Sequence, residues 1–279
     1  MARFVLTADD YAMTPAVTRG ILACLEAGRI TATGAMTNRP HWKSFAPQLG
    51  AFEGKADLGL HFNLTCGVPL TAMPRLAPGG ELPKLPDILR AGSLRRLPLA
   101  EVAGELEAQL SAFEDAMGRM PDFIDGHQHV HAMPGVRRAL GAVLAKRYPR
   151  EKPYLRNPVD RLAAIRARRL SIGKATLVAT LSGPFAKRMR ALGFSLNEGF
   201  AGYSSFNTKR DFGSDFAHFL KHPGAKHLVM CHPGEVDDEL LRLDPVTATR
   251  PLEKEFFLSE RFLETCDAAG MKMVRFAQL

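Results

Sequence analysis

Short runs of apolar and β-branched residues alternate with helical stripes along the first part of the chain. Residues 3–8 form an apolar run that predicts a strand. Thr14-Pro15 then supplies a helix N-cap followed by proline at the first helical position, and the apolar residues that follow keep helical spacing until Gly28. Residues 30–36 and 57–64 predict the next two strands. This strand–helix–strand order is typical of a parallel sheet.

The rest of the chain continues the alternation around one long loop. Residues 66–98 are rich in Pro, Gly and Leu without clear periodicity, and a loop of that length in a compact domain is usually functional, for example as a lid over a site. An apolar stripe predicts a helix from Glu101 to Met117. Residues 122–131 predict a strand that runs into a loop. Further strands are predicted at 154–156, 226–231 and 271–276, and further helices at 161–170 and about 257–269. Because there is no internal repeat and no low-complexity linker, we expect residues 1–279 to form a single barrel-like α/β domain.

Composition and charge narrow the class of protein. The 279 residues are 46% hydrophobic and 24% charged, which excludes a disordered polymer, a disulfide-rich miniprotein and a coiled coil. The four cysteines lack C-x-x-C spacing and indicate a reduced protein. The N-terminal residues fit no signal peptide, and no apolar stretch is long enough to span a bilayer of about 30 Å. We therefore expect a soluble cytoplasmic protein, whose net charge of +8 raises the question of an acidic partner.

Polar residues gather at the carboxyl ends of the predicted strands, where parallel α/β architectures build their sites. Asp9 and Asp10 end the first strand, and two adjacent carboxylates repel each other unless a cation or a proton resolves the conflict. His61 shares the polar face of the strand at 57–64 with Gly59. On local sequence alone, a metal site and a solvated acidic turn explain Asp9 and Asp10 equally well. A single histidine such as His61 is more often a hydrogen-bonded structural residue than a metal ligand.

The segment DGHQHVH at residues 125–131 carries the strongest chemical signal. Four side chains share one parity, so an extended segment would aim them all to one side: Asp125, His127, His129 and His131. Neutral imidazole is a common ligand of Zn²⁺ and similar metals, and a nearby carboxylate can orient it. Histidine is a poor core residue, so the pattern favours a metal site, although an exposed histidine stretch that binds metal adventitiously would look the same.

His232 ends the strand at 226–231 and is fixed by Pro233-Gly234, a position suited to a general acid or base. Together the strand ends supply acids, histidine ligands and a spare histidine, which is the inventory that metal-assisted hydrolysis requires. The chain contains no G-x-S-x-G, no P-loop and no G-x-G-x-x-G after a strand. Serine hydrolase, P-loop NTPase and Rossmann interpretations therefore lose their main support.

Taken together and in order, four motifs resemble the YdjC-like carbohydrate deacetylase family, which includes chito-oligosaccharide deacetylases and the deacetylase linked to hopanoid biosynthesis. They are TADDY at 7–11, GLHFNLT at 59–65, DGHQHVH at 125–131 and MCHP at 230–233. The resemblance implies an α/β fold, a distorted (β/α) barrel of the glycoside hydrolase/deacetylase type, with one divalent metal ion, magnesium or zinc. It also implies hydrolytic removal of an N-acetyl group from an amino sugar, carried by an oligosaccharide or linked to a lipid or another aglycone.

The same resemblance implies roles for the matching residues. It implies Asp10, His61 and His127 as the metal ligands. It implies Asp9 as the base that activates the metal-bound water and His232 as the acid that protonates the departing amine. The residues that it places in contact with substrate, or behind the ligands, are Asp125, His129, His131 and Arg156.

Two functions of other kinds stay open. Another metal-dependent barrel hydrolase would act on a phosphoester or a glycosidic bond, with Asp9 and Asp125 as the carboxylates of a glycosidase. A non-catalytic protein that binds nucleic acid or anionic surfaces would use the lysine and arginine side chains of residues 161–190. This segment has no aromatic residues interleaved with the basic ones. We expect no nucleic-acid partner and no integral membrane contact, and we leave open a membrane-surface or lipid-linked substrate and a homodimer.

Overall fold

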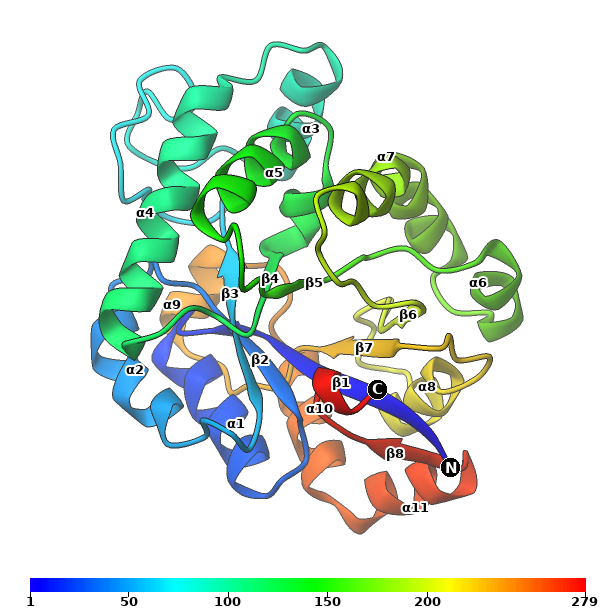
Figure 1. Cartoon of the computed structure of the whole chain (residues 1–279). Coiled ribbons are helices and arrows are strands. Elements are labelled where there is room, and N and C mark those ends of the chain that lie inside the picture. Colours follow the sequence, from blue (N-terminus) through cyan, green and yellow to red (C-terminus); the bar gives the residue numbers. More distant parts are fainter.

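The computed structural model describes all 279 residues and contains an eight-stranded parallel sheet (Figure 1). The strands are β1 (Ala2–Tyr11), β2 (Ala32–Ala35), β3 (Asp57–Phe62), β4 (Phe123–Gly126), β5 (Tyr154–Leu155), β6 (Phe200–Ala201), β7 (His227–Cys231) and β8 (Met271–Met273). Their order is β5-β4-β3-β2-β1-β7-β6, and β8 pairs with the start of β1. The long central strand β1 is buried continuously from Phe4 to Tyr11, as expected for a parallel strand covered on both faces.

The sheet curls until its two edges meet. A single parallel bridge between Leu155 of β5 and Leu196, just before β6, joins them, and the Leu155 N–H donates to the Ser195 carbonyl oxygen at 2.9 Å. The strands therefore form an irregular ring with one narrow joint. This arrangement confirms the predicted distorted (β/α) barrel.

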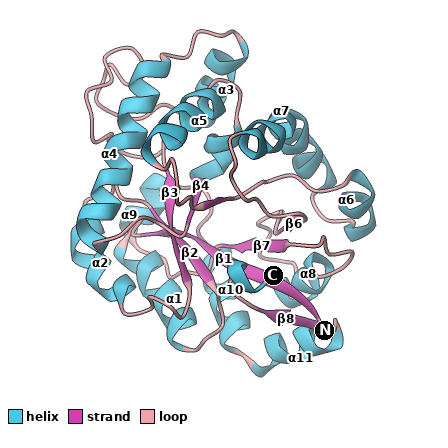
Figure 2. Ribbon diagram, viewed as in Figure 1, coloured by secondary structure: helices cyan, strands magenta, loops and turns pink.

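Helices surround the strands on the outside (Figure 2). They are α1 (Pro15–Glu26), α2 (Trp42–Gly50), α3 (Leu85–Ser93), α4 (Leu99–Met117), α5 (Val136–Arg147), α6 (Leu162–Arg168), α7 (Ile172–Ala191), α8 (Phe212–Phe219), α9 (Asp238–Leu243), α10 (Thr249–Leu258) and α11 (Glu260–Ala268). Short 3₁₀ segments occupy His127–Ala132 (η1) and Phe276–Gln278 (η2). None of these helices has the length and apolar character that crossing a bilayer requires.

Helix α1 shows how closely local sequence can specify an element. The Thr14 hydroxyl accepts the Val17 N–H at 3.3 Å, and Pro15 occupies the first turn, where its missing N–H costs nothing. Val17 and Ile21 belong to the buried face that packs on the barrel. The helix ends before Gly28, whose φ of 65° lies in the left-handed region that glycine adopts without strain.

The long loop at 66–98 is tied down rather than free. The Glu105 carboxylate on α4 accepts the backbone N–H groups of Leu70 and Thr71 at 3.0 and 2.9 Å. The same loop contains α3, which the sequence pattern did not predict, and Leu85 and Leu89 of α3 line a cavity at the carboxyl ends of the strands. The loop that we expected to cover a site therefore contributes α3 to the wall of this cavity.

Other elements differ from their predictions for local reasons. The predicted strand at 122–131 ends at Gly126. The predicted helix at 257–269 is two helices, separated at Ser259, whose ψ of 158° is extended. Helix α7 was not predicted, because its buried stripe includes small and polar residues such as Ala175 and Ser182.

Candidate active site

A β-bulge near the end of β1 positions the two adjacent carboxylates. Between the pairs Ala8↔Thr33 and Tyr11↔Ala35, β1 contains one residue more than β2, and Asp10 has a φ of 75°. In a regular strand consecutive side chains point to opposite faces. The extra residue removes that constraint, so that Asp9 and Asp10 both line the same cavity.

Three buried side chains converge beside the bulge: Asp10, His61 and His127. The Oδ1 atom of Asp10 lies 3.3 Å from His61 Nε2 and 3.0 Å from His127 Nδ1. The ligand atoms of all three side chains lie within 4.8 Å of one another. Two imidazoles and one carboxylate form a donor set that suits a zinc-type cation and leaves positions open for water or substrate.

Asp125 and Arg156 hold this cluster from behind. Asp125 Oδ1 lies 2.6 Å from His61 Nδ1, which leaves His61 Nε2 facing Asp10. Burial lowers the pKa of His61, but the carboxylates of Asp125 and Asp9 outweigh it and raise that pKa to about 10. These buried carboxylates therefore favour a positive charge at the position of His61. A cation bound by the three donors would supply that charge.

A close approach of the neighbouring strand leaves just enough room for His61. A Cβ atom at Gly34 on β2 would come within 3.0 Å of the His61 Cβ and 3.2 Å of Asp125 Oδ1. A side chain at position 34 would therefore displace the His61–Asp125 pair. Glycine keeps the pair in contact.

Asp9 is oriented by a guanidinium. Arg156 is fully buried, donates to both oxygens of Asp9, and also pairs with Asp125. Burial raises the pKa of Asp9 above its usual value even though Arg156 opposes the shift. Since Arg156 lies behind the carboxylates with no exposed surface, it braces Asp9 and does not reach the open cavity.

His232 follows β7 and faces Asp9 across the cavity. Its Nε2 lies 4.0 Å from Asp9 Oδ2, and its backbone N–H donates to the Glu253 carboxylate at 2.6 Å. Burial lowers the pKa of His232 well below its ordinary value, while Asp10 opposes that shift. The Phe206 ring packs edge-on against the imidazole, with 5.5 Å between centroids.

The extended geometry expected for residues 125–131 is wrong beyond Gly126. The chain turns there into η1, with Gln128 and His129 in the left-handed region at φ values of 52° and 59°. Such values cost non-glycine residues about 1 kcal/mol or more each and are common at functional sites. Because the alternation breaks, His127 points to the carboxylate cluster while His131 turns away from it.

The other two histidines of the motif have separate surroundings. His131 Nε2 lies 2.8 Å from the carbonyl oxygen of Arg156, and burial lowers the pKa of His131 to about 4, so its neutral ring donates a hydrogen bond there. This contact fixes the backbone that carries the Arg156 guanidinium. The His129 ring packs edge-on against Phe200 and Tyr203 and lines the cavity.

Arg250 and Asp244 complete the cluster and were missed in the sequence. Arg250 Nη2 donates to Asp10 Oδ2 at 2.7 Å, and Asp244 Oδ2 lies 3.6 Å from His127 Nε2. Burial would raise the pKa of Asp10, but Arg250 and His127 hold it well below its usual range. One signal was present, since Arg250 and Glu253 fall within the buried stripe of α10, where charged residues are unusual.

These residues surround a cavity of about 410 Å³ at the carboxyl ends of the strands. Its polar part contains Asp9, Asp10, His61, His127 and His232. Its apolar walls come from α3 and α7, with Leu85 and Leu89 facing Leu177 and Leu181. The volume lies in the usual range of small-molecule sites.

Asp9 and Asp125 cannot both reach a substrate, as the two carboxylates of a glycosidase must. Asp125 is fully buried and bonded to His61 and Arg156, and it does not line the cavity. A glycosidase needs two carboxyl groups that reach opposite sides of one sugar bond. The geometry therefore removes Asp125 from that role.

Solved structures show the same fold. A protein from Enterococcus faecalis V583, whose description concerns cellobiose-phosphate cleavage, superposes with a TM-score of 0.76 at 20% identity over 99% of this chain and 98% of that chain. A family 4 acetyl xylan esterase from Clostridium thermocellum superposes with a TM-score of 0.50 at 10% identity, over 99% of this chain and 89% of that chain. At these identities the likeness concerns the fold.

Sequence comparison gives closer relatives. A chitooligosaccharide deacetylase from Enterobacter sp. (strain 638) is 36% identical, and one from Citrobacter koseri is 38% identical, each over 132 residues that make up 47% of this chain and 51% of the relative. The chain thus spans about half the length of these curated relatives. The family model described as YdjC-like protein matches residues 3–268, which include every residue of the cluster. The chain therefore belongs to the YdjC-like family.

Proposed function

We propose that this protein is a metal-dependent carbohydrate deacetylase that hydrolyses the N-acetyl group of an amino sugar. The observation that carries the proposal is the convergence of Asp10, His61 and His127 in one cavity, with Asp9 and His232 4.0 Å apart beside them. The partial match to chitooligosaccharide deacetylases supports the same substrate class.

The three donors fit one divalent cation, Zn²⁺ or Mg²⁺, and two imidazoles suit the former better. When bound, such an ion polarises an acetyl carbonyl and lowers the pKa of a water molecule. Asp125 keeps His61 in the tautomer whose Nε2 lone pair faces the ion position. Arg250 neutralises the far oxygen of Asp10, which keeps that carboxylate ionised.

In this proposal Asp9 takes the proton of the attacking water. Arg156 holds both Asp9 oxygens and so fixes the direction of the carboxylate, and burial raises its pKa toward the range useful for a base. His232, on the other side of the cavity, is neutral at rest because burial lowers its pKa. The proton that it delivers to the departing nitrogen is therefore the one that Asp9 takes from the water and passes to the imidazole 4.0 Å away. Glu253 holds the His232 backbone, and Phe206 packs against the ring.

Replacement of Asp9 by Asn tests the base. The substitution keeps the size of the side chain but removes a basic oxygen, so acetate release from N-acetylglucosamine oligomers should fall by roughly 10²–10⁴-fold. Metal content, measured by elemental analysis, should stay the same because Asp9 is not among the three donors. Full activity in this variant would contradict the assignment.

Asp115→Asn is the matched control, since Asp115 is exposed on α4 and has no ion-pair partner. It should retain wild-type turnover. Reducing-sugar release, measured in the same reactions, separates a deacetylase from a glycosidase. Addition of a chelator should abolish acetate release in the wild type and the control, and metal should restore it.

A further inference from the structure

The net charge of the protein is concentrated in one segment. Residues 161–190 contain eight of the 37 basic residues and none of the 29 acidic ones, so this segment alone accounts for the net charge of +8. The remainder of the chain is balanced. The segment forms α6 and α7, which pack against each other on the outside of the barrel (Figure 1).

Most of these basic side chains have no carboxylate partner. No carboxylate oxygen lies within 4.0 Å of five of them: Arg166, Arg169, Lys174, Lys187 and Arg188. Arg168 is the internal exception, because it is buried, pairs with Asp160 and donates to the Phe200 carbonyl oxygen. An exposed cluster of unpaired cations creates a positive potential that attracts polyanions.

Large apolar side chains are exposed among these cations. Leu162 is 52% exposed at the start of α6, Ile172 is 39% exposed at the start of α7, and Leu177 is 59% exposed one turn further on. We call these three residues, with Arg166, Arg169, Lys174, Lys187 and Arg188, the α6–α7 face. Basic side chains that alternate with exposed leucine and isoleucine are typical of helices lying at a membrane surface.

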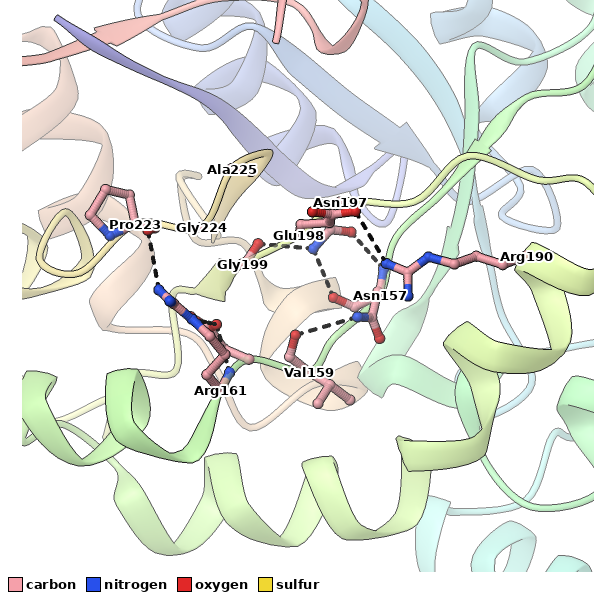
Figure 3. A pocket seen from close by; sticks show the side chains of 11 residues that line it. Asn157, Val159, Arg161, Arg190, Asn197, Glu198, Gly199, Pro223, Gly224 and Ala225 are labelled. Carbon is pink, nitrogen blue, oxygen red and sulfur yellow. Dashed lines mark hydrogen bonds and ion pairs between the residues drawn. The ribbon is translucent and has the colours of Figure 1, made fainter.

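The α6–α7 face extends from the active-site cavity to a second hollow. Lys174 and Leu177 are exposed and also line the active-site cavity. About 24 Å from Lys174 along α7, Arg190 borders a polar hollow of about 640 Å³, and Arg161 enters it from the opposite side (Figure 3). Arg161 and Arg190, which lie 3.9 Å from Asp160 and 3.6 Å from Glu198, extend the basic surface to the far end of α7.

We propose that the α6–α7 face docks the protein on an anionic membrane surface, with the active-site cavity opening beside the bilayer. Clusters of four to eight Lys and Arg residues on an amphipathic helix bind acidic lipid headgroups, and the exposed leucines enter the headgroup boundary. Docking of this kind involves no membrane-spanning helix. The proposal concerns binding alone and does not depend on the reaction in the cavity.

The apolar side chains favour a lipid surface over a nucleic acid. Single-stranded nucleic acids bind to surfaces where aromatic rings stack on bases between the cations. Within 161–190 the only aromatic residue is Phe185, which is fully buried. Exposed leucine and isoleucine gain nothing from a phosphodiester backbone, whereas they bury apolar area in a bilayer.

Vesicle co-sedimentation of the 279-residue protein tests the proposal. We expect binding to vesicles of equal parts phosphatidylcholine and phosphatidylglycerol, little binding to phosphatidylcholine alone, and release by salt. Arg166→Gln/Arg169→Gln/Lys187→Gln should lower the partition coefficient by roughly a hundredfold, since each basic residue near an anionic surface contributes roughly fivefold. Leu162→Ser/Ile172→Ser should weaken binding while keeping all the charges.

The matched control carries the same change in charge elsewhere. Arg150→Gln/Arg242→Gln/Lys43→Gln removes three exposed cations that have no ion-pair partner, and it should bind like the wild type. If both triple variants lost vesicle binding equally, binding would depend only on the net charge of the protein, and the proposal would be overturned. So would the absence of binding to anionic vesicles, or tighter binding to a DNA duplex that depends on the same three residues. Unchanged thermal unfolding shows that each variant is folded.

Discussion

Glu253 is a buried carboxyl group that no ion pair neutralises. Its one polar contact is the His232 backbone N–H at 2.6 Å, and burial raises its pKa from 4.5 to about 7. A carboxyl group that is protonated in the folded state and ionised in the unfolded state stabilises the fold fully below the unfolded pKa. That contribution is lost as the pH rises through the folded pKa.

Glu253→Gln tests this linkage. The amide can still accept the His232 N–H but cannot ionise. The unfolding free energy of the wild type relative to this variant should therefore fall by up to about 3 kcal/mol as the pH rises from 4.5 to above 7. Denaturant unfolding across that pH range measures the difference, and a difference independent of pH would refute the linkage.

Glu253→Ala separates positioning from charge. It leaves the His232 N–H without an acceptor, so the loop that carries the proposed acid loosens, and kcat should fall while KM changes little. Glu255→Gln, on the exposed side of the same helix, is the matched control and should behave like the wild type.

At the scale of elements, two backbone irregularities place the cluster. The bulge in β1 aims both of its aspartates into the cavity, and the left-handed pair in η1 separates His127 from the other histidines. The residues of the cluster were nearly all visible in the sequence, because Asp, His and Arg stand out at strand ends. The bulge and the left-handed pair could not be predicted from the sequence, because they arise from tertiary contacts that override strand alternation.

The strain at Gln128 gives a prediction for η1. Glycine adopts its φ of 52° without steric conflict, whereas valine does so poorly. We expect Gln128→Gly to keep the wild-type unfolding free energy within about 1 kcal/mol, because relief of strain offsets the greater freedom of the unfolded chain. Gln128→Val should lose about 1–3 kcal/mol. Equal stability of the two variants would show that the segment relaxes.

At the scale of the whole molecule, one end of the barrel collects buried charges that do not balance. Four buried carboxylates line or support the cavity, and two buried guanidinium groups face them: Asp9, Asp10, Asp125 and Asp244, with Arg156 and Arg250. The excess is negative, and a divalent cation at the three donors would offset it. Metal binding and folding should therefore be coupled.

Removal of metal tests that coupling. A chelator should lower the Tm of the wild type, and metal should restore it, because a ligand at roughly 100 times its Kd contributes about 3 kcal/mol. His127→Ala should bind less metal by elemental analysis, and its Tm should respond little to the chelator. A wild-type Tm that stays constant while metal is stripped would contradict the coupling.

The fold class followed from strand–helix alternation and from the motif resemblance, whereas the partners of the cluster depended on contacts far apart in the chain. Arg250 lies 240 positions from Asp10, and Asp244 reaches His127 from the segment between α9 and α10. No local pattern records such distances. The sequence shows that residues 161–190 are basic. The exposure of Leu162 and Leu177 depends on how α6 and α7 pack on the barrel, and the sequence alone does not indicate it.

The joint between β5 and β6 is held by fewer backbone hydrogen bonds than the other strand pairs of the barrel, so it should separate more easily. Beyond the Leu155–Ser195 hydrogen bond, the Asn197 side chain takes the place of a ladder partner, accepting the Asn157 N–H at 2.6 Å and donating to the Asn157 carbonyl oxygen at 2.9 Å. Separating this seam breaks a few hydrogen bonds, whereas separating β1 from β7 breaks a full ladder. Amide exchange should therefore begin at the seam.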